Sequence, residues 1–383
     1  MNKLLIAAAG AGKTTYLINQ ALSITDNVLI TTFTIENTES IKQKIIKKIG
    51  CIPPHIHIQT WFSFLFQHGV KPFQGSVKEE LYTKSIHGVN FSKQQSGIKC
   101  QHPRGFPILY NEKTEFFQHY FDGNSRIYSD KLSKFVVRAN EITNGKVIER
   151  LIQVFPNIFI DEIQDLSGYD LNILDLLFRS PANVLLVGDP RQTTYLTHWE
   201  KKNSKYHYGK IDLFITEKCR KVDRITIDTT TLNYSHRNNS IICNFSSLLY
   251  NNYTPTQACT CLDCHHSRKH EGIYAILDTD VQYYFEFYKP IILRYSKSTK
   301  TISSNNIYTF GSAKGKEFND VLIYPTQAME QWLVDFNDSP LESTTKAKFY
   351  VAITRARYSV AFVVSPHIYS QLENLPHIIN WRR

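Results

Sequence analysis

Residues 7–14 read Ala-Ala-Ala-Gly-Ala-Gly-Lys-Thr, and this stretch decides the fold. It matches the phosphate-loop pattern G-x-x-x-x-G-K-[ST] at each fixed position except the first, where Ala7 replaces glycine. The apolar run before it is typical of a buried strand, and residues 13–22 are typical of a helix. Glycines there let backbone N–H groups surround phosphate oxygens, and a helix N-terminus favours negative charge. We expect a nucleotide-binding loop, with an ordinary glycine turn as the alternative.

Such a loop needs a carboxylate partner, and residues 157–165 supply one. A buried strand there runs into Asp161 and Glu162. Asp161 at the strand tip would hold Mg²⁺ through water, with Thr14 as a second ligand, and Glu162 would polarise the attacking water. Sheets of this class bind ligands at the carboxyl ends of their strands. A solvated acidic loop is the alternative interpretation.

Strand and helix patterns alternate along most of the chain, which indicates parallel sheets covered by helices. Residues 68–150 interrupt the alternation and predict an insertion that is mostly helical, and the patterns after residue 224 form a second α/β unit. The expected strands are residues 3–8, 28–33, 57–60, 157–161, 183–188, 224–229, 273–277, 290–295, 321–324 and 360–364. The expected helices are residues 13–22, 38–48, 61–67, 171–178, 239–250 and 346–353.

Composition limits the setting and the partners. The 383 residues carry a formal net charge of +10, which favours an anionic partner such as nucleic acid. The seven cysteines are odd in number and lack a disulfide framework, so a secreted disulfide-built fold is not expected. The sequence has no apolar run long enough to cross a membrane. We expect a reducing, cytoplasmic location.

Further segments, in order along the chain, resemble the motifs of superfamily 1A helicases of the UvrD/Rep type. The clearest is Asp-Glu-Ile-Gln-Asp at 161–165, which resembles D-E-x-Q-D. Three others are Thr-Phe-Thr at 32–34, Thr-Trp-Phe-Ser at 60–63 and Val-Gly-Asp-Pro-Arg-Gln at 187–192. The last three are Leu-Asn-Tyr-Ser-His-Arg-Asn at 232–238, which resembles L-x-x-N-Y-R-S, Thr-Phe-Gly-Ser-Ala-Lys-Gly-Lys-Glu-Phe at 309–318, which resembles T-I-H-x-x-K-G-L-E-F, and Tyr-Val-Ala-Ile-Thr-Arg-Ala-Arg at 350–357, which resembles Y-V-A-x-T-R-A.

This resemblance implies an α/β fold with two RecA-like phosphate-loop domains in tandem. The first would comprise residues 1–67 and 151–205, with residues 68–150 as its inserted 1B-like subdomain. Residues 206–383 would form the second domain, 2A. The family's large 2B insertion is absent, because the stretch between Arg294 and Thr309 is too short to fold as a domain.

The resemblance also assigns roles around ATP and Mg²⁺. Glu162 would be the base, Gln192 would sense the γ-phosphate or the attacking water, and Arg237 and Arg355 would be arginine fingers. Hydrolysis would then require the two RecA-like domains to close on the nucleotide held between them. The nucleotide-binding candidates are Ala9, Gly10, Ala11, Gly12, Lys13, Thr14, Thr15, His236, Gly315 and Glu317, and the metal candidates are Thr14 and Asp161.

Two departures leave the choice between ATP and GTP open. The family's adenine-stacking tyrosine is His236 here, and too few residues precede Ala7 for the glutamine motif that reads adenine. The nucleic-acid candidates, from the same resemblance, are Phe33, Thr34, Thr60, Trp61, Phe62 and Tyr195. For Trp61 and Phe62, core packing is an equal alternative.

The densest group of cysteines and histidines spans residues 259–266. Cysteine and histidine are zinc ligands, so zinc at Cys259, Cys261, Cys264 and His265 is one interpretation. The spacing is tighter than that of paired zinc knuckles, and reduced cysteines in a loop are the alternative.

Three functions remain in view. The leading one is an ATP-dependent translocase or helicase on single-stranded or tailed DNA, with 3′-to-5′ polarity as the family implies. The second is a DNA-gated regulatory ATPase, partnered with a nuclease or another protein subunit, as in an anti-phage defence complex. The third, a phosphate-loop kinase of a small molecule, is disfavoured by the arginine motifs around Arg237 and Arg355.

Overall fold

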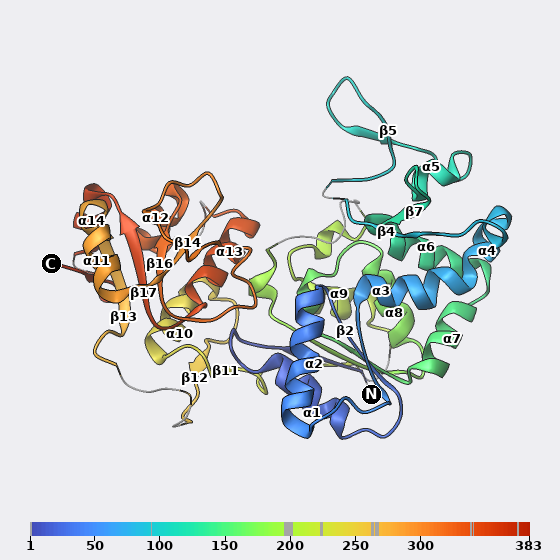
Figure 1. Ribbon diagram of the computed structural model, residues 1–383, viewed down its shortest axis with the longest axis horizontal. Coiled ribbons are helices and arrows are strands. Elements are labelled where there is room, and N and C mark those ends of the chain that lie inside the picture. Colours follow the sequence, from blue (N-terminus) through green and yellow to red (C-terminus); the bar gives the residue numbers. More distant parts are fainter. Residues whose placement is uncertain are drawn as a thin grey trace. The chain divides into compact units, whose positions relative to one another are not determined.

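The computed structural model describes the chain except at residues 1, 93, 195–201, 223–224, 262–263, 265–267, 338, 340 and 374. Its contacts divide it into two compact units (Figure 1). The first unit comprises residues 1–5, 14–188 and 196–228. The second unit comprises residues 6–13, 189–195 and 229–383. Most of the phosphate loop therefore groups with the second unit, although the strand before it and nearly all of the helix after it belong to the first.

The first unit is built on a six-stranded sheet with the order β10-β1-β9-β8-β2-β3. Its described pairings are all parallel. Each residue of β2 and β8 is buried, as expected for a parallel sheet covered on both faces. The strands are β1 (Asn2–Ile6), β2 (Val28–Thr32), β3 (Ile56–Thr60), β8 (Asn157–Ile160), β9 (Asn183–Gly188) and β10 (Ile225–Asp228).

The last of these strands corrects the sequence analysis. The pattern at residues 224–229 was expected to open the second unit, but β10 pairs with β1 and completes the first sheet. Residues 206–228 accordingly group with the first unit. The pattern of a single strand does not indicate which strand it pairs with, so the pairing of β10 with β1 could not be predicted from the sequence.

Two helices of the first unit begin at capping residues that the sequence supplies. Thr34 caps α2, which ends at Gly50 in a left-handed conformation, and Thr60 caps α3. The helices around this sheet are α1 (Lys13–Leu22), α2 (Ile35–Ile49), α3 (Trp61–Phe64), which continues into a π-helix (Leu65–Val70), α8 (Asp170–Phe178) and α9 (Ile211–Lys218).

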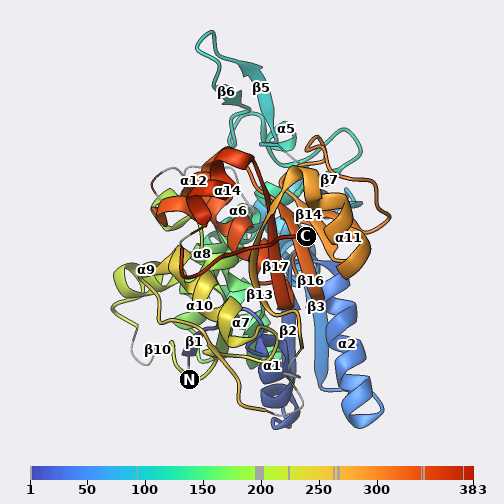
Figure 2. The same cartoon turned by 90° about the vertical axis from the view of Figure 1, so that its left-hand side faces the viewer.

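The region between the π-helix and β8 has helices as its main regular elements. Two small sheets, absent from the sequence prediction, accompany them: β4 pairs with β7, and β5 pairs with β6 as a hairpin that projects away from the helices in Figure 2. The elements are α4 (Gln74–Val77), α5 (Phe116–Tyr120), α6 (Ser129–Ile142), α7 (Lys146–Val154), β4 (Gly88–Asn90), β5 (Ile98–Gln101), β6 (Pro107–Leu109), β7 (Arg126–Tyr128) and the 3₁₀ turns Lys71–Phe73 and Glu79–Tyr82.

The second unit has its own six-stranded sheet, with the order β15-β14-β16-β17-β13-β18 and parallel pairings throughout the described strands. Its strands are β13 (Gly272–Leu277), β14 (Ile291–Arg294), β15 (Ile307–Thr309), β16 (Phe318–Tyr324), β17 (Ala356–Val364) and β18 (Ile379–Asn380). Its helices are α10 (Ser240–Ser247), α11 (Val281–Tyr288), α12 (Gln327–Asp335), α13 (Ser343–Ile353) and α14 (Pro366–Leu372).

Apolar side chains of this sheet form a separate core on each face. Ile273 and Ala275 of β13 join a cluster with Phe245 of α10 and Trp332 of α12. The alternate residues of β13 join a second cluster with Tyr284 of α11. The sheet is therefore covered by helices on both sides, which is the predicted α/β architecture. Among the described helices, none has the length and apolar character needed to cross a bilayer.

Candidate functional site

The phosphate loop joins β1 to α1, and its glycines have conformations that other residues adopt only with strain. Gly10 has φ 74° and Gly12 has φ 76°. A Cβ atom at Gly10 would also lie 2.6 Å from Ser235 Oγ and 2.7 Å from Arg237 Cβ. Glycine at this position therefore lets residues 235–237 approach the loop. The neighbouring candidates differ in exposure: Ala9 and Ala11 are buried, and Thr15 is exposed on α1.

The two residues predicted to bind the metal, Thr14 and Asp161, lie together in the first unit. Thr14 Oγ1 donates a hydrogen bond of 2.8 Å to Asp161 Oδ2. Asp161 follows β8, and its backbone N–H donates to the Thr31 carbonyl at 2.8 Å, which fixes the carboxylate at the strand end. A hydroxyl and a carboxylate are the hard oxygen ligands that magnesium takes. The pair fits a magnesium ion.

Glu162, the predicted base, has a left-handed backbone with φ 57° and ψ 40°. Such a conformation costs roughly 1–3 kcal/mol for a residue with a side chain and is common at functional sites. Its N–H donates to Asp161 Oδ1 at 2.9 Å, and Gln164 Nε2 donates to its carboxylate. A Cβ at Gly188 would lie 2.4 Å from Gln164 Oε1, so glycine at the end of β9 leaves the room that Gln164 occupies.

In the second unit, Asp189 is a fully buried carboxylate that gathers several donors. Arg191 Nε donates to it at 2.7 Å, Gln192 Nε2 at 2.8 Å and the Tyr350 hydroxyl at 3.5 Å. Burial opposes a charge on Arg191, but the Asp189 carboxylate raises the pKa of the guanidinium above its ordinary value. Arg191 also donates to the Ala7 carbonyl at 3.1 Å, so it fastens the start of the phosphate loop.

Two predicted catalytic residues, Gln192 and Arg355, contact each other. Arg355 Nη2 donates to Gln192 Oε1 at 3.1 Å. The same guanidinium donates to the carbonyls of Val351 at 3.0 Å and Lys316 at 3.1 Å, and Arg355 is 1% exposed. Gly315, a predicted nucleotide contact, has φ 82° in the turn directly before Lys316. The structure thus holds Arg355 in a defined orientation beside Gln192.

Arg237 and Glu317, also predicted site residues, form an ion pair with a separation of 3.3 Å. Arg357 pairs with the other oxygen of Glu317 at 2.8 Å. Burial alone would raise the pKa of Glu317, but Arg357 and Arg237 lower it below its ordinary value. Burial lowers the pKa of Arg237. In this structure Glu317 therefore acts as the partner of two arginines, while its predicted contact with a ribose remains a prediction.

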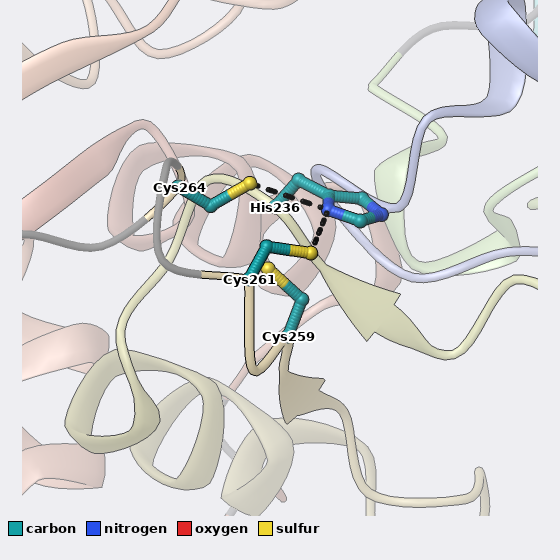
Figure 3. Close-up of side chains that lie close together, drawn as sticks. All are labelled: His236, Cys259, Cys261 and Cys264. Atoms are coloured by element: carbon teal, nitrogen blue, oxygen red, sulfur yellow. Dashed lines mark hydrogen bonds between the residues drawn. The ribbon is translucent and has the colours of Figure 1, made fainter.

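The fourth member of the cysteine cluster differs from the one that the sequence suggested. His265 lies outside the described residues. Among the residues that the structure does describe, His236 joins Cys259, Cys261 and Cys264, and their ligand atoms all lie within 4.8 Å of one another (Figure 3). His236 had been considered only as a nucleotide contact, because it lies 23 or more positions away and no spacing pattern links it to the cysteines.

The residues predicted to contact nucleic acid have different structural roles. Trp61 is fully buried, and its Nε1 donates to Asp170 Oδ1 at 2.7 Å, so it is a core residue and not a stacking platform. Thr34 and Thr60 are helix caps. Phe62 is half-buried and packs edge-on against Phe33 at 6.0 Å. Phe62 also packs edge-on against Phe91 at 5.4 Å, and Phe91 is 66% exposed. Tyr195 lies outside the described residues.

Sequence reasoning missed Arg191 and Arg357. Arg191 occupies a variable position of G-D-x-x-Q, and Arg357 directly follows T-R-A. The sequence signal for them is a charged residue within an otherwise apolar segment. Such a segment is expected to be buried, and a buried charge needs a partner of opposite charge.

Comparison with known families matches residues 107–200 to the UvrD/REP helicase N-terminal domain. That range contains Asp161, Glu162 and Gln192. With the two parallel sheets, the match confirms the predicted fold class of tandem RecA-like units. No curated protein matches the sequence.

Solved structures that resemble the chain include three structures of viral helicases. Arterivirus nonstructural protein 10 (helicase) is 13% identical with a TM-score of 0.47, covering 97% of this chain and 62% of its own. The same protein in complex with DNA is 13% identical with a TM-score of 0.46, covering 97% of this chain and 63% of its own. The PRRSV helicase is 14% identical with a TM-score of 0.42, covering 98% of this chain and 54% of its own. This chain therefore spans less than two thirds of their length.

Proposed function

We propose that this chain is an ATP-hydrolysing motor that moves along single-stranded DNA in the 3′-to-5′ direction. The observation that carries the proposal is the 2.8 Å contact between Thr14 and Asp161, at the end of a phosphate loop. A phosphate-loop hydroxyl beside a strand-end carboxylate is the arrangement that binds the magnesium of a nucleoside triphosphate. The match of residues 107–200 to helicases directs that chemistry towards a nucleic-acid motor.

The residues of the phosphate loop and of the turn after β8 then each have a task. The loop N–H groups and Lys13 bind the phosphates, and Thr14 and Asp161 hold the magnesium ion, which neutralises phosphate charge when bound. Glu162 accepts the proton of the attacking water. The Gln164 amide, which donates to Glu162, keeps the carboxylate in one orientation.

Residues of the second unit stabilise the charge that develops during hydrolysis. Gln192 is oriented at both ends of its amide, by Asp189 and by Arg355. A fixed amide of this kind positions either a γ-phosphate oxygen or a water. Arg237 and Arg355 supply guanidinium groups that match phosphate oxygens in geometry and charge.

The test measures ATP hydrolysis by the purified chain with and without single-stranded DNA. Stimulation by DNA is expected, together with displacement of a strand from 3′-tailed but not 5′-tailed duplexes. The salt dependence of DNA binding should be steep, because backbone phosphates dominate such contacts. Absence of stimulation by either DNA or RNA would contradict a translocase.

Lys13→Ala is the matched check on the nucleotide site. Hydrolysis should be abolished and nucleotide binding weakened, because the phosphates lose the lysine of their loop. Lys42→Ala, at an exposed position paired with Glu39 on α2, should change neither. Hydrolysis that survives Lys13→Ala at more than about a tenth of the wild-type rate, a barrier change of about 1.4 kcal/mol, would remove the assignment of the loop.

A second candidate, a DNA-gated regulatory ATPase, is favoured by one observation. Strands β14 and β15 are adjacent in the second sheet, with Arg294 paired to Thr309, so the described residues between them form only a short connection. This is where the resembling family carries its 2B insertion. If DNA stimulates hydrolysis but a duplex of about 30 base pairs, held by its stacking energy, stays intact, this candidate is preferred.

A further inference from the structure

Three cysteines and one histidine of the second unit converge on a point beside the phosphate loop (Figure 3). We call this group the Cys₃His cluster. Its members are His236, Cys259, Cys261 and Cys264. Each offers one ligand atom, and Cys51 and Cys100, which lie elsewhere in the chain, are exposed and free.

The fold itself assembles the cluster from segments distant in sequence. Strand β11 (Tyr234–Ser235) pairs in parallel with β12 (Gln257–Ala258), so the residues that follow the two strands, His236 and Cys259, emerge side by side. The Cys259 N–H donates to the Ser235 carbonyl at 2.9 Å, which extends this pairing by one step. The Cys264 N–H donates to the Cys261 carbonyl at 3.2 Å, so Cys264 lies close to Cys261.

The separations between ligand atoms suit a tetrahedral metal. The distance from His236 Nδ1 is 3.5 Å to Cys264 Sγ and 3.8 Å to Cys261 Sγ. A tetrahedral zinc ion with Zn–S of about 2.3 Å and Zn–N of about 2.0–2.1 Å places its sulfur and nitrogen ligands about 3.6 Å apart. Three sulfurs and one imidazole nitrogen are also a frequent ligand set of structural zinc.

We propose that the Cys₃His cluster binds a structural zinc ion, with His236 Nδ1 as the fourth ligand. All four positions are filled by the protein, which is the mark of a structural and not a catalytic site. Zinc takes three thiolates and a neutral imidazole, so the thiol protons are released on binding. The proposal does not depend on the proposed function.

The ion would act on the phosphate loop through the backbone of one ligand. The His236 N–H donates to the Gly10 carbonyl at 3.0 Å, and Arg237 follows directly in sequence. A Cβ at Gly12 would lie 4.0 Å from His236 Cδ2, so the imidazole edge also lies near the loop. Zinc at Nδ1 would therefore stabilise the segment that carries a proposed arginine finger.

The first test measures the zinc content of the full chain after purification without chelator. About one zinc per chain is expected, and Cys259→Ser, Cys264→Ser or His236→Ala should each reduce it severalfold, since each removes a ligand. Cys51→Ser and Cys100→Ser are the matched controls and should retain the metal. Wild-type protein that contains no zinc and takes up none when it is added under reducing conditions would overturn the proposal.

Cobalt substitution identifies the ligands even if a variant folds poorly. The wild-type chain with Co²⁺ should show the visible absorption of a tetrahedral site together with thiolate-to-cobalt bands. His236→Ala should alter that spectrum, and His265→Ala should leave it unchanged. The opposite result, with His265 required and His236 dispensable, would overturn the assignment of His236. Octahedral cobalt without thiolate bands would overturn the site.

Discussion

Two regions of this chain assemble their polar side chains in opposite ways. One is the turn after β8, and the other is the arginine group of the second unit, which we define as Arg355 with its partner Gln192. Asp161, Glu162 and Gln164 are neighbours in sequence, so one strand end and one strained turn assemble them. The contact between Gln192 and Arg355 instead joins residues 163 positions apart. The first region is complementary to a cation and the second to an anion. Each of the following changes tests one side of this contrast.

Arg355→Ala is expected to have the largest effect. Hydrolysis should slow by about 10³–10⁵-fold, because an arginine finger stabilises charge that develops only in the transition state. Arg179→Ala, at an exposed surface pair with Asp175, is the control and should leave turnover unchanged. The measurement is steady-state ATPase at saturating nucleotide.

Because Arg355 is buried, its loss also threatens the fold. Arg355→Lys keeps the charge but not the planar fork, so it should melt close to wild type and still hydrolyse slowly. If the lysine or alanine variant turns over at the wild-type rate, the arginine group is structural and the contrast between the two regions loses its catalytic meaning.

Glu162→Gln should slow hydrolysis by about 10²–10⁴-fold, the usual contribution of a general base. Nucleotide binding should persist, because Thr14 and Asp161 are untouched and glutamine retains an oxygen to accept from Gln164. Binding is measured with a fluorescent nucleotide, and turnover separately. Glu149→Gln, at an exposed position of α7, is the control. Should binding disappear together with turnover, Glu162 supports the loop and is not the base.

Trp61 and Phe62 provide a smaller, paired test of the first unit. Phe62→Ala should weaken single-stranded DNA binding by about 1–3 kcal/mol, the value of one stacked base. Trp61→Phe should leave DNA affinity unchanged but lower the free energy of unfolding by about 1–3 kcal/mol, because Asp170 loses a buried donor. Equal losses of DNA affinity in both variants would show that the phenylalanine effect is indirect.

Acid should affect the second unit through a residue outside its arginine group. His270 stacks on Tyr288 with ring centroids 3.7 Å apart and contacts the Tyr284 hydroxyl at 2.7 Å. Burial lowers the pKa of His270 to about 4. The folded state therefore disfavours the protonated ring, and stability, complete above the unfolded pKa of about 6.5, should fall as the pH drops from there towards 4.

The measurement is the melting temperature of wild type, His270→Phe and His367→Phe between pH 7.5 and 4.5. His270→Phe should flatten the acid dependence, whereas His367→Phe, at an exposed position, should follow wild type. An unchanged acid slope in His270→Phe would assign the effect to other groups.

The sequence predicted what short-range physics determines. Residues 183–188 were expected as a strand and form β9, and residues 13–22 were expected as a helix and form α1. Continuous apolar runs and a glycine turn suffice for such elements. The Thr14–Asp161 contact followed as well, because parallel strands deliver their ends to one edge of a sheet.

The features that the sequence did not predict depend on contacts between residues distant in sequence, and no local pattern indicates such contacts. The indole of Trp61 suits a core and a stacking platform equally well, and only the position of Asp170 decides between them. His236 joins the cysteines through the pairing of β11 with β12, two short strands without a sequence signal. The other domain boundaries and the catalytic roles stay predictions.

The pairing of β10 with β1 has a consequence for how the protein is made. Asn2 finds its partner in Ile225, more than 220 residues later in the order of synthesis. At the usual ribosomal rates of about 5–20 residues per second, the edge of β1 that pairs with β10 stays unpaired for roughly 11–45 s, until β10 has been synthesised. An unpaired strand edge invites pairing with other chains. The nascent first unit is therefore expected to be a client of chaperones until residue 228 has emerged.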